Sequence, residues 1–288
     1  MTTETQKYET VLIEYPADHV ARVVLNRPKQ RNAQNTQLLY ELNLAFNDIA
    51  KDDNIKVVIL AGMGDHFSAG HDLHQPPNAE NMSVFEPIGT WCGFGCAGAE
   101  SRMGIEKEIY LGVSERLRNF AKPTIAEVQG WCIAGGLMLI WPCDIIIASE
   151  DAKFMDNTVN MGLAGAEFFN HPWELGVRKA KELLFTSDFW DAKEAHRLGM
   201  VNHVVTREEL TEFTLNLAKR IARQPLLALR CTKEAVNNAQ DAAGRSTVMS
   251  SQFAMHQLGH AHNQQEYGIL IDPNSDAAKM SKAAMYKK

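Results

Sequence analysis

The chain has 288 residues, of which 45% are hydrophobic, and this length suits one domain with a C-terminal appendage. A net charge of −6 without a basic run argues against a nucleic-acid-binding protein. The sequence has no membrane-length apolar stretch, no secretory signal and no disulfide-type cysteine spacing, which predicts a cytoplasmic protein with no membrane partner and five reduced cysteines.

The first hundred residues alternate between β-rich and helical patterns. Runs of β-forming residues at 10–14 and 20–25, separated by a turn, predict a hairpin. Apolar residues at helical spacing predict a helix over 38–49, and a short apolar run at 57–60 predicts a strand buried on both faces. The polar stretch 75–104 has no steady period. A loop of that length inside a compact domain is usually functional or mobile, and we expect it to shape a substrate pocket.

The second half of the chain begins with the same alternation and ends in helices. A helix is expected over about 106–120, and the strands 124–128 and 144–148 enclose a glycine-rich turn and an apolar helix. This order predicts an α/β fold. We place a core at residues 1–205 and a helical oligomerisation region at 206–288. Its last helix, near 247–262, is expected to pack against another subunit because little chain remains to cover it.

Two loops that follow predicted strands carry small residues where backbone can approach a ligand. They are FSAGHDL at 67–73 and GWCIAGG at 130–136. The second loop opens a helix, and the unpaired N–H groups of a helix N-terminus suit a developing negative oxygen. A Gly-Gly pair at a helix start is more often a tight packing turn than an oxyanion site, so neither loop is decisive alone.

Several motifs together resemble one known family. They are LNRPKQRNA at 25–33, FSAGHDL at 67–73, KPTIAEVQG at 122–130, CD at 143–144 and EAHRLGMVN at 194–202. In this order and spacing the chain resembles the enoyl-CoA hydratase/isomerase (crotonase) family from about residue 9 to residue 235. The resemblance implies a spiral of repeated ββα units with a trimerising helical C-terminus. It also implies a homotrimer or dimer of trimers, and an acyl-CoA substrate whose coenzyme A is part of the substrate, with no separate cofactor.

The resemblance also implies a substrate site. Its oxyanion hole, two backbone N–H groups that bind the thioester oxygen, falls on His71 and Gly135. The coenzyme A falls near four residues: Lys29, Ala69, Asp72 and Leu73. Lys29 would be the phosphate partner, although a solvated turn lysine is an equal interpretation.

The chain departs from the family at the two glutamates that act on water in its hydratases. By alignment those positions are Met138 and Thr158, which would still line the substrate site but cannot transfer protons. Glu167 follows a glycine-rich turn and precedes two phenylalanines, so burial could raise its pKa and make it the acid/base; it could also be a helix N-terminal glutamate. Asp156 is a weaker candidate, with a turn role as its alternative.

Two further motifs lack the context that their function requires. GFGCAG at 93–98 matches the dinucleotide-binding pattern but follows no predicted strand. His256, His260 and His262 have helical spacing suited to a metal, but no acidic residue completes a set. We therefore expect neither nicotinamide nor metal binding, and we expect surface histidines on the last helix.

These observations predict an enzyme of lipid or ring-compound catabolism that generates an enolate at an acyl-CoA thioester. With one plausible acid/base residue, isomerisation or bond cleavage is easier to justify than hydration, although a hydratase that uses Glu167 alone stays open. Two further alternatives stay open. One is a hydrolase that cleaves a C–C bond in a cyclic β-diketone, and the other is a catalytically silent acyl-CoA-binding protein.

Overall fold

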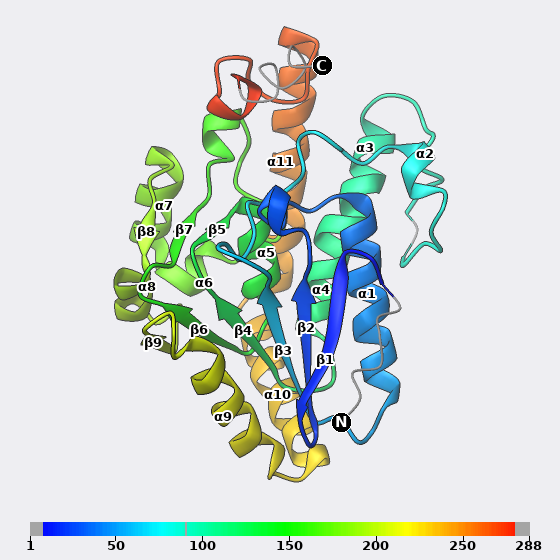
Figure 1. Ribbon diagram of the computed structural model, residues 1–288. Coiled ribbons are helices and arrows are strands. Elements are labelled where there is room, and N and C mark those ends of the chain that lie inside the picture. Colours follow the sequence, from blue (N-terminus) through cyan, green and yellow to red (C-terminus); the bar gives the residue numbers. More distant parts are fainter. Residues whose placement is uncertain (1–7, 90, 280–288) are drawn as a thin grey trace.

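A computed structural model describes residues 8–89 and 91–279, and a six-stranded sheet forms its frame (Figure 1). β1 (Val11–Ala17) and β2 (Val20–Leu25) form the antiparallel hairpin expected from the sequence. The strands that follow are parallel to β2: β3 (Val57–Gly62), β4 (Thr124–Val128), β6 (Ile145–Ser149) and β9 (His203–Val205). Their order is β1-β2-β3-β4-β6-β9, and the mixture of strands and helices confirms the α/β prediction.

Helices cover both faces of this sheet because its central strands are apolar on both sides. Every residue of β3 and β4 is buried. One face packs against α1 (Thr36–Lys51) and α4 (Gly112–Arg118), and the other packs against α9 (Leu210–Ala222) (Figure 1). The helix α9 lies beyond residue 205, where we placed the end of the core, so part of the helical region completes the core of its own chain.

A second, three-stranded sheet carries one of the glycine-rich loops. It consists of β5 (Trp131–Ile133), β7 (Lys153–Met155) and β8 (Trp190–Asp191). The chain passes from β4 to β5 through Gly130, whose φ of 56° favours glycine, and a β-carbon there would collide with Asp65 O. This turn brings the loop after β5 close to the ends of the six-stranded sheet.

The segment before α4 is more helical than its sequence suggested. α3 (Ala99–Glu106), a π-helical segment (Lys107–Leu111) and α4 run on as one rod, so the helix predicted from residue 106 begins at residue 99. The short α2 (Ala79–Met82) lies in the loop before it. Between β3 and β4 the described residues form no strand. The dinucleotide-like motif at 93–98 therefore lacks the strand that such a motif needs.

Six more helices complete the described residues, and the last two of them, with 17 and 23 residues, are the longest. They are α5 (Leu137–Ile140), α6 (His171–Leu175), α7 (Val177–Thr186), α8 (Ala192–Leu198), α10 (Leu226–Ala242) and α11 (Arg245–Tyr267). Short 3₁₀ turns occur at Pro28–Gln30, Ala134–Gly136 and Val159–Met161. Within the described residues, no helix combines the length and apolarity needed to span a bilayer.

The helix α11 corrects one prediction from the sequence. It is longer than the expected 247–262, and one side of it is buried against its own chain. His256 and His260 lie on that side with exposed fractions of 1% and 6%, whereas His262 is exposed. Two of the three histidines are therefore not surface residues. Polar residues recur every three or four positions along this side and pair with other polar groups, which gave the sequence no apolar stripe to reveal the buried face.

Candidate active site

A cavity of about 1280 Å³ opens among the two sheets, α3 and α11. It exceeds the roughly 300–1,000 Å³ of ordinary small-molecule pockets, which suits a long ligand. Segments far apart in the sequence line it, among them the loop after residue 69, the 76–79 and 98–110 stretches, and α11. The polar stretch 75–104 contributes to this wall, as the sequence predicted.

The structure brings the two small-residue loops together at the base of this cavity. Ser68 N–H donates to Trp131 O over 3.1 Å, and Ile133 N–H donates to Ser68 O over 3.0 Å. Gly70 has a φ of 89°, and a β-carbon there would lie 2.8 Å from Ile133 O. Only glycine fits so close an approach of two backbones, so the small residues serve the contact between the loops.

Each loop leaves one backbone N–H without an acceptor. Gln34 N–H donates to Gly70 O and Asp72 N–H donates to Gln34 O, both around the intervening His71. The N–H groups of His71 and of Gly135, in the turn that opens α5, find no acceptor within residues 8–89 and 91–279. The two residues are in contact, because a β-carbon on Gly135 would collide with the His71 ring. Two free donors this close can bind one anionic oxygen.

The His71 ring extends from this loop into the cavity. It stacks on Tyr110, with 3.6 Å between the ring centroids, and its Nδ1 lies 3.8 Å from Glu167 Oε1. Burial lowers the pKa of His71 to about 3, so the ring is neutral at physiological pH and places no positive charge beside the two free N–H groups.

Glu167 lines the same cavity, which an acid/base residue must do to reach a substrate. Its side chain is buried, with His71 on one side and His256 Nε2 3.7 Å away on the other. Burial raises the pKa of Glu167 well above its ordinary value, and the nearby charge of Glu106 raises it further. This agrees with the environment expected from the sequence. A carboxyl in such a place can donate a proton, and once ionised it is a stronger base than an exposed one.

Asp156, the weaker candidate, is fully occupied by hydrogen bonds. Its Oδ1 accepts from the N–H and hydroxyl of Thr158, and its Oδ2 accepts from Ala166 N–H and lies 2.9 Å from His171 Nε2. Burial opposes ionisation, but His171 and Thr158 hold the pKa of Asp156 at about 2. We assign it a positioning role, because it fixes the turn directly before Glu167. His171 pairs with this carboxylate and not with Glu167.

Comparison with known proteins identifies the family of the chain. The sequence pattern of the Enoyl-CoA hydratase/isomerase family matches residues 16–86 and 96–271. EchA13 of Mycobacterium tuberculosis, provisionally assigned as an enoyl-CoA hydratase, is 44% identical over 89% of this chain and 80% of its own. The chain belongs to the enoyl-CoA hydratase/isomerase family.

Further relatives support the same family and its crotonase fold. A crotonyl-CoA hydratase of Syntrophomonas wolfei is 33% identical over 80% of this chain and 82% of its own. The crystal structure of a probable enoyl-CoA hydratase from Mycobacterium smegmatis superimposes with a TM-score of 0.82 at 43% identity, over 93% of this chain and all of that one. Membership of this family makes the chain an enzyme that acts on acyl-CoA.

The four residues that the family resemblance assigned to coenzyme A, Lys29, Ala69, Asp72 and Leu73, all line the cavity. Thr158, one of the two positions where the family's hydratases carry a glutamate, also lines the cavity, and its hydroxyl donates to Asp156 Oδ1. Met138 does not line the cavity, because its side chain is 1% exposed and packs in the hydrophobic core. This difference arises because α5 turns that position inward.

Asp72 also lines the cavity, but its carboxylate serves the loop. Its Oδ2 lies 2.9 Å from Arg27 Nη1, and its Oδ1 accepts from the N–H groups of His74 and Gln75. These bonds hold the chain in the turn that follows His71. A contribution of Asp72 to ligand binding therefore passes through the shape of this loop.

A cation–aromatic pair beside Lys29 was missed in the sequence. The Arg31 guanidinium lies 4.9 Å from the centre of the Trp131 ring, and both residues line the cavity. The His66 ring also stacks on the Trp131 ring, with 4.6 Å between the ring centroids. The motif at 25–33 contains Arg31 but gives no sign that β5 brings Trp131 to it from 100 residues away.

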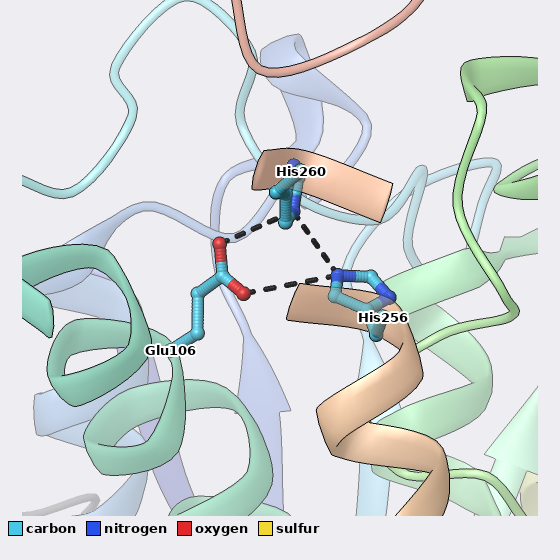
Figure 2. Close-up of side chains that lie close together, drawn as sticks. All are labelled: Glu106, His256 and His260. Atoms are coloured by element: carbon cyan, nitrogen blue, oxygen red, sulfur yellow. Dashed lines mark hydrogen bonds and ion pairs between the residues drawn. The ribbon is translucent and has the colours of Figure 1, made fainter. Parts of the chain in front are cut away.

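A second missed group lies deeper in the cavity, where Figure 2 shows three side chains converging from α3 and α11. His256 Nε2 and His260 Nε2 are 3.1 Å apart. Glu106 Oε1 lies 3.3 Å from His260 Nε2, and Glu106 Oε2 lies 3.7 Å from His256 Nε2. All three residues are buried. The sequence around these histidines offers no acidic residue that completes a set, so no metal site was predicted. Glu106, from a distant part of the chain, supplies the acidic group.

Proposed function

We propose that the enzyme binds the thioester carbonyl of an acyl-CoA through the N–H groups of His71 and Gly135 and stabilises the enolate that forms when a neighbouring C–H loses its proton. The free donor pair beside a buried carboxyl carries this proposal. Fixed donors in a site that excludes water stabilise developing negative charge more strongly than water does. Coenzyme A enters this reaction as part of the substrate.

We propose further that Glu167 is the acid/base residue. One carboxyl can remove a proton from one carbon of the acyl chain and return it to another, which moves a double bond and leaves no net change in protons. Hydration would need a second group to deliver water, and neither Met138 nor Thr158 can supply it. Isomerisation of an unsaturated acyl-CoA, in the breakdown of lipids or ring compounds, is therefore the reaction that these residues support best.

The mouth of the cavity suits the coenzyme A portion of this substrate. Lys29 and Arg31 both line it, and Lys and Arg side chains are the usual partners of phosphate groups. We propose that these two residues bind the phosphates and that the Trp131 ring supports Arg31. The acyl chain would then extend past His71 toward Glu167.

Exchange of acyl protons tests the proposed reaction. In deuterated water, we expect the enzyme to incorporate deuterium next to the thioester of suitable acyl-CoA substrates, with crotonyl-CoA hydration much slower than this exchange. Mass spectrometry of the recovered thioester measures both. Vigorous hydration of crotonyl-CoA would contradict the one-carboxyl mechanism. Binding of acyl-CoA without exchange would favour a silent binding protein, and cleavage of a free cyclic β-diketone would favour the hydrolase.

We also propose that the chain assembles as a homotrimer or dimer of trimers. The side of α11 away from its own chain exposes two large apolar residues, Met255 at 57% and Leu258 at 62%, and such exposure is typical of an interface. Light scattering at micromolar concentration should give three or six times the mass of one chain. Met255→Glu with Leu258→Glu should lower that mass, and a monomeric wild-type protein would contradict the proposal.

A further inference from the structure

The rings of His256 and His260 are held in one orientation by backbone carbonyl groups. His256 Nδ1 lies 2.6 Å from Gly165 O, and His260 Nδ1 lies 2.7 Å from Leu270 O. A carbonyl oxygen can only accept a hydrogen bond, so each Nδ1 carries the hydrogen. In the neutral ring each Nε2 then presents a lone pair, and both lone pairs point into the same space.

Two facing lone pairs 3.1 Å apart repel each other unless a positive centre lies between them. The carboxylate of Glu106 faces the same point, and burial keeps water from screening it. Neither Glu106 nor the adjacent Glu167 forms an ion pair with a lysine or arginine in the described parts of the chain. The arrangement therefore calls for a cation, either a shared proton or a metal ion.

The separations between the three candidate ligand atoms are close to those in a tetrahedral metal site. Four ligands at about 2.0–2.1 Å from Zn²⁺ in a tetrahedron are separated by roughly 3.3–3.4 Å. The three separations here are 3.1, 3.3 and 3.7 Å, so shifts of a few tenths of an ångström would complete the geometry. The geometry points to a site for a divalent transition-metal ion of the Zn²⁺ class, bound by Glu106, His256 and His260.

The surroundings of the three ligands are those of a metal site. Hydrogen bonds from ligating histidines to backbone carbonyls fix the ring tautomer in such sites, and both Nδ1 atoms make them. Gln257 Nε2 donates to Glu106 Oε2 and orients that carboxylate. His256 and His260 are four residues apart on one helix, the spacing at which two histidines reach one ion.

The fourth coordination position would face the cavity. Glu106, His256 and His260 all line it, and Glu167 Oε1 lies 3.7 Å from His256 Nε2 on the same side. Water, Glu167 or an oxygen of a bound ligand could fill that position. The three ligands that define the site are neither the N–H donors nor the proposed acid/base, so metal binding can be tested without measuring turnover.

Metal binding to the full-length protein tests the inference without measuring turnover. After removal of metals with a chelator, the wild-type protein should bind one equivalent of Co²⁺ per chain and develop the visible absorption of a tetrahedral cobalt site. Zn²⁺ should displace the cobalt and raise the melting temperature. Glu106→Gln and His260→Gln should each weaken Co²⁺ binding by at least about tenfold. Loss of a residue that only supports a ligand already lowers metal affinity by about this factor, so loss of a ligand should cost no less.

His262→Gln is the matched control, because His262 lies on the same helix but is exposed. This variant should bind Co²⁺ like the wild type and keep the zinc-induced rise in melting temperature. Folding of His260→Gln is checked by its circular dichroism, and a folded variant without the rise supports the site. Wild-type protein that takes up less than a stoichiometric amount of Co²⁺, or equal binding by His260→Gln, would overturn the inference and leave a shared proton between the histidines.

Discussion

Replacement of Glu167 with glutamine is expected to lower kcat by about a hundred- to ten-thousandfold, the usual contribution of a general acid/base. Glutamine keeps the size and the hydrogen-bonding capacity of the side chain but cannot take up or release a proton at neutral pH. The buried position between His71 and His256 should be kept, so affinity for an acyl-CoA that cannot react should change little. Steady-state kinetics and calorimetric titration measure the two quantities separately.

Glu174→Gln is the matched control for this substitution. Burial raises the pKa of Glu174 to about 7, and its Oε1 accepts from Asn170 Nδ2, but the residue does not line the cavity. Loss of this carboxyl should alter stability and leave kcat near the wild-type value. If Glu167→Gln behaved in the same way, with normal turnover and only a shifted melting temperature, the carboxyl would have a structural role and the proposed mechanism would be wrong.

The backbone part of the site could be predicted from the sequence because its signals are local. The small residues of FSAGHDL and GWCIAGG follow strands that short apolar runs reveal, and strand ends place such loops at one edge of a sheet. The motif resemblance then paired the two loops. The structure confirms that they lie together, through the hydrogen bonds between Ser68 and the residues of β5.

The side-chain part of the site was harder to predict, since it depends on contacts between distant residues. Glu106 and His256 are separated by 150 positions, and α11 conceals its buried side because polar groups pair with one another there. Asp156 and Glu167 were both plausible acid/base residues in the sequence. Only the hydrogen bonds from Thr158 and Ala166 distinguish the occupied carboxylate from the one that faces the cavity.

Removal of the Gly135 N–H is expected to have the second large effect on turnover. A simple Gly135→Pro variant would confuse two causes, because any β-carbon at this position collides with the His71 ring. The test therefore uses His71→Gly as background, which removes the ring and keeps the N–H of residue 71. In that background Gly135→Ala adds a β-carbon and retains the donor, whereas Gly135→Pro also removes the donor.

The comparison between these two double variants isolates the hydrogen bond. One lost oxyanion donor costs roughly a hundred- to a thousandfold in rate, so the proline variant should have a kcat lower than that of the alanine variant by this factor. Free coenzyme A has no thioester carbonyl and should bind both equally, which also shows that the proline variant is folded. Equal kcat in the two variants, with coenzyme A binding intact, would mean that the carbonyl oxygen does not rest on Gly135, and the enolate would then need a different source of stabilisation.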